Sequence, residues 1–198
     1  MNRLLELVHA LHTGITTNLW VLHHNMGHHR NFLDQTMDES RWKRKDGTVM
    51  GKLEYTFSIA LTAHPRAYKV GERYPKKRSE YVTFTAVTVG ILAALIFFKP
   101  LNALLVFVIP MTLSFLYTCL VTYGHHAELD TDDEFAASYN KMDKLYNFLT
   151  GNLGYHTAHH HRSGVHWSKL PELHEQIKTQ IPEYCYTETR LEKLGLTS

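Results

Sequence analysis

The residues of this chain best suited to chemistry are histidines, and three of them share a regular spacing. His156, His159 and His160 stand at i, i+3 and i+4, so a helix would carry all three imidazoles on one face. Imidazole is the commonest protein ligand for metals and is neutral enough near pH 7 to bind one. Packing alone rarely places three histidines on one helix face. The run predicts a metal site, while a solvated helix face is the alternative for this cluster taken alone.

Two further clusters strengthen the metal interpretation. His24 and His28 are four residues apart and would share a helix face, whereas His29 would be rotated by about 100° on an α-helix. That arrangement favours ligands divided between two neighbouring metals over a single closed site. The third cluster is His125-His126, of which either residue can be the ligand.

The element that must position these clusters is a pair of apolar segments. Val82–Phe98 contains 17 residues without a charge, and Leu101–Tyr123 contains 23. Lys99-Pro100 between them can form a tight reversal, because proline cannot continue the first helix. Two such runs predict a transmembrane helical hairpin, and a buried hairpin of a soluble protein is the alternative.

The flanking charges predict the orientation of this hairpin. Lys76, Lys77 and Arg78 precede it, whereas Lys99 is the single charge at the far end. The positive-inside rule then places both ends, and every histidine cluster, on the cytoplasmic side. Eleven Lys and Arg lie between Arg41 and Arg78, which favours a role at the membrane surface over a solvated charged face.

Composition narrows the class of protein. The 198 residues are enough for a single domain over residues 1–198, and the net charge of +2 argues against a nucleic-acid partner. Cys119 and Cys185 are too far apart for a CxxC site or a disulfide framework. We therefore predict an all-α integral membrane protein with a transmembrane hairpin and a cytosolic, histidine-rich helical cap.

Shorter helices are predicted before the hairpin. Leu7–Leu22 carries no Asp, Glu, Lys or Arg, but its 16 residues fall short of the roughly 20 that a span needs. We expect one helix there, at the membrane boundary or against other helices, with His9 and His12 on one face. Tyr55–Ala63 predicts a short interfacial helix that ends at His64-Pro65.

After the hairpin, Glu128–Glu134 indicates a solvated acidic loop rather than a set of ligands. Lys141–Leu149 predicts an amphipathic helix, and Ser163-Gly164 the end of the helix that carries the last cluster. Pro171 is well placed as the first residue of another helix, which should stop near Pro182.

The order of these features resembles a known family. His24-x-x-x-His28-His29, a membrane hairpin, His126, and His156-x-x-His159-His160 resemble the histidine boxes of membrane fatty-acid desaturases and of the related alkane hydroxylases and acyl-chain decarboxylases. The segments 152–160 and 166–174 are similar to the last box of bacterial desaturase-like proteins. The resemblance covers about residues 19–174.

The resemblance implies a di-iron oxidoreductase. Such proteins use two non-haem irons and O2 to remove hydrogen from an unactivated C–H bond of an acyl or alkyl chain. The ligands it implies are His24, His28, His29, His126, His156, His159 and His160. Histidines alone would allow zinc, copper, nickel or iron, so the choice of iron comes from the resemblance.

The chain departs from the family pattern at its start. Relatives carry an earlier box, His-x-x-x-His or similar, after a preceding pair of membrane helices, and His9-x-x-His12 has the wrong spacing for it. We therefore expect that the chain corresponds to the C-terminal two-thirds of a family member and lacks the first box. Thr122 also stands where some relatives carry Asn.

The expected function is O2-dependent desaturation of lipid acyl chains, with hydroxylation or oxidative decarboxylation as the alternatives. A non-catalytic, histidine-rich membrane metal-binding protein is the alternative from another class, but such carriers place histidines or acids within their spans, and these spans contain none. Electrons must come from a separate ferredoxin, rubredoxin or cytochrome. The expected location is a membrane, the bacterial inner membrane by the resemblance.

Overall fold

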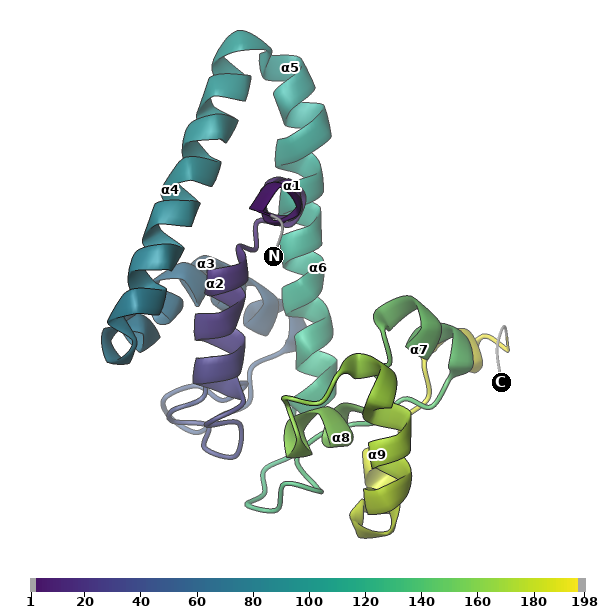
Figure 1. Cartoon of the computed structure of the whole chain (residues 1–198). Helices are drawn as coiled ribbons and strands as arrows, with labels where there is room; N and C mark the ends of the chain where they lie inside the picture. Colours follow the sequence, from purple (N-terminus) through teal and green to yellow (C-terminus); the bar gives the residue numbers. More distant parts are fainter. Residues whose placement is uncertain (1–2, 196–198) are drawn as a thin grey trace. The chain divides into compact units, whose positions relative to one another are not determined.

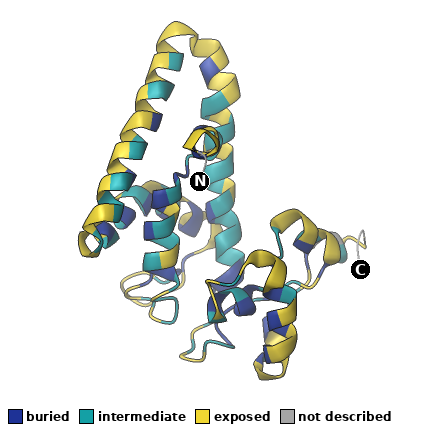
Figure 2. Cartoon of the chain, in the orientation of Figure 1, coloured by how far each residue is buried: buried dark blue, intermediate teal, exposed yellow. Residues whose placement is uncertain are grey.

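Two long apolar helices occupy the middle of the chain (Figure 1). In this computed structural model, which describes residues 3–195, α4 runs over Pro75–Phe98, and a second helical segment runs over Pro100–His126. By length and composition both can cross a membrane. Few of their side chains are buried (Figure 2), and some are largely exposed, such as Phe97 at 81% and Phe98 at 73%. Long apolar helices that leave their side chains unburied fit a lipid environment better than the core of a soluble protein.

The second arm of the hairpin is continuous but changes its winding. It consists of α5 (Pro100–Ala103), a π-helical segment over Leu104–Val108, and α6 (Ile109–His126). The reversal lies at Lys99, which leaves helical geometry at φ −143° before Pro100 starts the next helix. The predicted hairpin and its turn are confirmed, although α4 begins seven residues earlier than Val82 because Pro75 initiates it.

The chain divides into two compact units. Unit 1 comprises Met1–Asn31 and Met37–Tyr123, and unit 2 comprises Phe32–Thr36 and Gly124–Ser198. All regular elements of the described residues are helical, with isolated β-bridges at Lys43–Val49 and Asn140–Tyr186, so the all-α class is confirmed. That the whole chain is a single domain stays a prediction.

In unit 1 the helix expected over residues 7–22 is broken into two. α1 (Arg3–Thr13) ends at Gly14, whose φ of +71° lies in the left-handed region that favours glycine. α2 (Thr17–Trp20) is then capped by the Thr16 hydroxyl, which accepts a hydrogen bond from Leu19 N at 3.2 Å. α1 contacts both arms of the hairpin.

The other long helix of unit 1 is longer than the sequence predicted. α3 (Lys52–Val70) continues through Pro65, where a stop was expected. Proline removes one helical hydrogen bond, but Tyr55, Ile59, Ala63 and Ala67 recur every four residues and are all buried. Burial of this stripe offsets the loss. The core of unit 1 consists of Ile15, Leu19, Leu22, Ala67 and Tyr81.

Unit 2 is built from short helices around a small core. It contains α7 (Lys144–Thr150), α8 (His156–His161), α9 (Leu170–Ile177) and α10 (Arg190–Lys193), with one 3-10 turn between α8 and α9 and two between α9 and α10. The predicted helices after the hairpin are confirmed with shifts of a few residues. The core residues are Ala158, Leu170, Leu173, Ile177, Ile181 and Cys185.

Buried polar contacts hold α8 in place. The Thr157 hydroxyl, which is fully buried, lies 2.9 Å from Ser138 Oγ and accepts a hydrogen bond from Asn140 Nδ2 at 2.8 Å. Before the helix, Gly154 allows a close backbone approach, because a Cβ there would lie 2.0 Å from Lys141 O. The histidines of α8 therefore stand on a segment that is packed and hydrogen-bonded on its inner side.

Candidate metal centre

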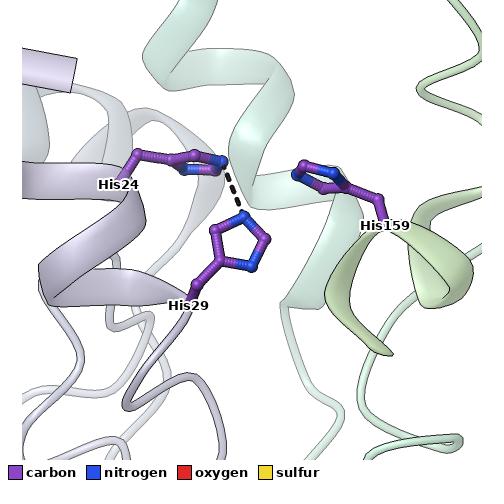
Figure 3. A group of neighbouring side chains, drawn as sticks. All are labelled: His24, His29 and His159. Atoms are coloured by element: carbon purple, nitrogen blue, oxygen red, sulfur yellow. Dashed lines mark hydrogen bonds between the residues drawn. The ribbon is translucent and has the colours of Figure 1, made fainter. Parts of the chain in front are cut away.

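The first histidine cluster lies on a π-helix, Val21–His28, which follows α2 directly. His29 N donates to His24 O at 2.9 Å, the i to i−5 bond of π winding. The wider turn brings His29 to His24, and their Nε2 atoms are 3.1 Å apart (Figure 3). The expectation that His29 lies about 100° away from the face shared by His24 and His28 assumed α-helical winding, and the π winding instead brings His29 next to His24. Short π-helical stretches frequently occur at functional sites.

His28 is oriented by a buried carboxylate. Its Nδ1 donates to Asp38 Oδ1 at 2.8 Å, and the side chains of both residues are 1% exposed. The same oxygen accepts a hydrogen bond from Ser40 N at 2.7 Å, so the carboxylate is itself fixed. An ionised carboxylate can only accept, hence Nδ1 carries the proton and Nε2 keeps its lone pair for a metal.

Rings around His28 complete the cluster of unit 1. The His24 ring lies 5.3 Å from that of His28, and the His29 ring lies 5.7 Å from it. Trp20 stacks on His24 at 4.2 Å with an interplanar angle of 30°. Three imidazoles are thus gathered within six residues, one of them hydrogen-bonded to a carboxylate and another stacked on an aromatic ring.

His23 is a buried neighbour of this cluster. Burial, helped by the positive charge of Arg66, lowers its pKa to about 3, so the ring is neutral at physiological pH. Its Nε2 is buried and has no hydrogen-bond partner among the described residues. A neutral ring next to the cluster adds no positive charge that would oppose binding of a cation.

The second cluster belongs to unit 2. His126, in the last turn of α6, directs Nδ1 to Ala137 O at 2.9 Å, and a carbonyl oxygen only accepts, so Nδ1 is protonated. Its Nε2 lone pair faces His156 Nε2 at 3.0 Å. Either His156 donates a proton into this contact, or both nitrogens share a cation. The Nδ1 hydrogen bond to the carbonyl is of the kind that orients metal-binding imidazoles, so this pair fits metal binding.

α8 brings its three histidines together as the spacing predicted. The His156 ring lies 5.6 Å from His159 and 4.8 Å from His160, and His159 and His160 are 5.6 Å apart. His160 also meets His126 edge to face at 4.6 Å. The cluster therefore combines α8 with the end of the hairpin, within unit 2.

His125 and His126 differ in how they meet α8. The His125 ring stacks face to face on His156 at 4.1 Å with an interplanar angle of 21°. His126 instead points a ring nitrogen at a ring nitrogen of the same residue. Stacked rings cannot share a metal placed in both ring planes, so the geometry of His126 is the better suited to ligation.

Other histidines take local partners. His9 Nδ1 lies 3.2 Å from Ile15 O, and His12 Nδ1 lies 2.8 Å from Val8 O. His64 Nδ1 bonds to Tyr81 Oη at 2.7 Å between α3 and α4. His161 Nδ1 approaches Glu134 Oε1 at 3.2 Å, which links α8 to the acidic loop.

Sequence reasoning missed Asp38 altogether. It lies ten residues after His28, in an irregular segment with no periodic or motif signal. Its role became visible only through the fold of the loop, which returns it to the π-helix. The preference of metal-bound histidines for a carboxylate partner would have made nearby acids candidates, but it could not choose among them.

The donor set indicates the metals that fit. Each unit supplies a cluster of imidazoles, and in each unit a hydrogen bond from Nδ1 fixes the tautomer of at least one. Imidazole-rich sets suit zinc, copper, nickel and iron. The residues of both clusters therefore fit metal binding, without distinguishing among these ions.

Comparison with known proteins supplies the chemistry that the donor set leaves open. The family model described as "Fatty acid desaturase" matches residues 1–191. No curated protein and no solved structure matches the chain. Fatty acid desaturases are oxidoreductases that use iron, and both the apolar hairpin and the histidine clusters agree with such a protein. The chain belongs to the fatty acid desaturase family.

Proposed function

We propose that this protein is a membrane oxidoreductase that removes hydrogen from the acyl chain of a lipid, with O2 as co-substrate and two non-haem irons as the cofactor. Family membership supports the class of reaction. The observation that carries the proposal is that two buried imidazoles have their tautomers fixed in the same way. His28 and His126 each commit Nδ1 to a fixed acceptor, so Nε2 of each ring keeps a lone pair that a metal can take, and Nε2 of His126 lies 3.0 Å from Nε2 of His156.

The ligands we propose come from both units. They are His24, His28 and His29 of unit 1 together with His126, His156, His159 and His160 of unit 2. When bound, the irons would supply O2 activation at open coordination positions. The protein would hold the tautomers of His28 and His126 through the Asp38 carboxylate and the Ala137 carbonyl.

The reaction requires an external supply of electrons. Desaturation of a CH2–CH2 unit consumes one O2, two electrons and two protons, and it forms one C=C bond and two water molecules. The two electrons would come from a separate donor of the ferredoxin, rubredoxin or cytochrome type. Hydroxylation uses the same number of electrons and places one oxygen atom in the product. It is one alternative outcome at the same site, and oxidative decarboxylation is the other.

We propose that the histidine clusters face the cytoplasm. The basic residues Lys76, Lys77 and Arg78 begin α4, and Lys99 is the single charge at the opposite end of the hairpin. The positive-inside rule supports this orientation. By the resemblance to bacterial desaturase-like proteins, the membrane would be a bacterial inner membrane.

Metal analysis and lipid profiling of one set of variants test the proposal. The wild-type chain, purified in nanodiscs, should contain iron, and an expressing strain should accumulate unsaturated acyl chains. His28→Ala and His159→Ala should lose both properties, whereas His12→Ala and His166→Ala, outside the clusters, should keep them. Iron-free protein with zinc or copper bound, and no change in the lipids, would instead indicate the non-catalytic metal-binding alternative.

A further inference from the structure

Positive charge gathers at the α3–α4 corner, residues 69–80. A 3-10 turn, Gly71–Arg73, joins the two helices, and the uncharged part of α4 begins at Val82. At a rise of about 1.5 Å per residue, Arg78 lies about 6 Å before Val82, which matches the depth of the headgroup layer beside the hydrocarbon of a bilayer. The corner therefore stands where α4, an apolar helix long enough to span a membrane, meets the headgroups.

Most cations of this corner have no carboxylate partner. Residues 69–80 contain five basic and two acidic residues, which leaves a net charge of +3. Lys77 pairs with Glu80 at 3.0 Å. The basic residues that form no ion pair within the part of the chain that the structure describes are Lys69, Arg73, Lys76 and Arg78. Basic residues with a carboxylate partner elsewhere are Arg3, Arg44, Lys169 and Lys178. The charge of the corner is thus available to an anion from outside the chain.

Tyrosine rings fix two guanidinium groups at this corner. The Arg78 guanidinium lies 5.1 Å from the centroid of the Tyr68 ring, and its side chain packs on Gly71, where a Cβ would lie 2.8 Å from Arg78 Cβ. Arg30 donates to Tyr74 Oη at 2.7 Å and lies 5.6 Å from the centroid of the same ring. A guanidinium stacked on a ring keeps N–H groups at its edge for a phosphate. These groups are therefore in place before an anion binds.

The exposed face of α3 is apolar. Leu53, Phe57 and Leu61 recur every four residues, and each of them is more than half exposed. Leu53 and Phe57 line a surface groove together with Leu113 and Tyr117 of α6. The apolar face of α3 is thus continuous with the side chains that the hairpin exposes, and the same hydrocarbon can cover both. This continuity places α3, and the corner at its C-terminal end, at the membrane boundary.

We propose that the α3–α4 corner binds the headgroup of an anionic phospholipid, with Arg73, Lys76 and Arg78 holding its phosphate. The acyl chains of this lipid lie along the exposed apolar faces of the hairpin and of α3. Clusters of Lys and Arg next to a membrane helix attract anionic lipids. A zwitterionic lipid gains less, because the cation of its own headgroup offsets the phosphate. The inference goes beyond the oxidoreductase function and does not depend on the irons.

A lipid fits this surface better than an acidic protein does. Lys76 and Arg78 stand within two helical turns of Val82, and Tyr68 and Tyr74 flank them, as tyrosines flank membrane spans at the level of the headgroups. A protein partner needs a patch that faces water, whereas the neighbouring face of α3 is apolar.

Native mass spectrometry of the full chain measures which lipids stay bound. The wild type is presented with equal amounts of phosphatidylglycerol and phosphatidylcholine that carry identical acyl chains. We expect it to retain phosphatidylglycerol preferentially. Arg73→Gln/Lys76→Gln/Arg78→Gln should lose that preference, by about fivefold for each charge removed.

A matched control removes the same number of charges from unit 2. Lys144→Gln/Lys169→Gln/Lys178→Gln changes three exposed lysines and should keep the wild-type preference. Arg73→Gln/Lys76→Gln serves if the triple variant of the corner fails to fold, because it leaves the packing of Arg78 on Gly71 intact.

Thermal unfolding in nanodiscs gives an independent readout. The wild type should unfold at a higher temperature in phosphatidylglycerol than in phosphatidylcholine, since a ligand of the folded state stabilises it. The difference should shrink in Arg73→Gln/Lys76→Gln and persist in the unit 2 control.

Equal retention of both lipids by the wild type would overturn the inference, as would a preference that the triple variant and the control keep alike. Excess inorganic phosphate should displace little phosphatidylglycerol, because a phosphate ion lacks the acyl chains. Complete displacement would identify a site for free phosphate and reject the lipid. Equal retention of the lipids, together with binding of an acidic ferredoxin that the triple variant loses, would assign the corner to a protein partner instead.

Discussion

Asp38 and His28 form a buried carboxylate–imidazole pair, with Oδ1 and Nδ1 2.8 Å apart and both side chains 1% exposed. Asp38→Asn keeps the shape but replaces one carboxylate oxygen with a donor, which competes with the protonated Nδ1 and favours the wrong tautomer. We expect iron affinity to fall by about 10- to 100-fold. Titration of the metal-free protein with ferrous iron measures the change. Asp46→Asn, in an exposed turn, is the control and should bind iron as the wild type does.

His126→Ala and His125→Phe should have unequal effects. His126 points Nε2 at His156 Nε2, whereas His125 stacks on the His156 ring. We expect His126→Ala to lose at least one iron per chain. His125→Phe should retain most of the metal, because a phenyl ring can replace the stacked imidazole but not a ligand. Metal analysis of both proteins decides the matter, and iron loss in His125→Phe alone would reverse the assignment.

Gly154→Ala should destabilise the segment that precedes α8. The added Cβ would lie 2.0 Å from Lys141 O and 2.5 Å from Asn147 Oδ1, so the backbone must shift. Overpacking of this kind costs about 1–3 kcal/mol, and occasionally more. A lower midpoint of thermal unfolding is the expected result. Gly164→Ala, where a Cβ meets nothing within 4 Å, should leave the midpoint within error of the wild type.

His174 should make the metal-free protein sensitive to acid. Burial lowers the pKa of this residue, which is 2% exposed and whose Nε2 lies 3.4 Å from Tyr186 Oη. The unfolded chain, with a pKa near 6.5, then binds more protons than the folded chain at mildly acidic pH. The contribution of His174 to stability is therefore complete above pH 6.5 and is lost as the pH falls below it, by up to about 1.4 kcal/mol per pH unit.

Denaturant unfolding of metal-free protein at pH 7.5 and pH 5.5 measures this dependence. His174→Phe should show a smaller loss of stability between the two values than the wild type, because Phe has no proton to bind. His166→Phe, at an exposed position, should follow the wild-type dependence. Identical pH dependences in all three proteins would contradict the role of His174.

We expect the hairpin to hold the protein tightly in the membrane. The chain should remain with the membrane fraction during carbonate extraction, because Pro75–Phe98 and Pro100–His126 expose apolar side chains along their lengths. Arginine at Val89 and Leu113, which are 58% and 62% exposed and lie near the middle of the two apolar runs, should lower insertion, since a central arginine costs about 2.5–3.5 kcal/mol on insertion scales. Recovery of the wild type in the soluble fraction without detergent would refute the membrane interpretation.

The sequence by itself determined the elements whose signals are local and periodic. Uncharged runs of 17 and 23 residues around Lys99-Pro100 predicted the hairpin, because the length of an apolar helix is written directly in the chain. The spacing of His156, His159 and His160 predicted their cluster, since residues i, i+3 and i+4 of a helix share a face wherever that helix lies.

The tertiary structure decided the features that depend on distant contacts. Packing of α3 carried it through Pro65, and π winding turned His29 toward His24. The return of the 34–40 segment paired Asp38 with His28, ten residues away. Proline and glycine set only local preferences of a few kcal/mol or less, and burial of a core outweighs them. Which carboxylate reaches a histidine depends on the path of a loop, and no periodicity in the sequence encodes that path.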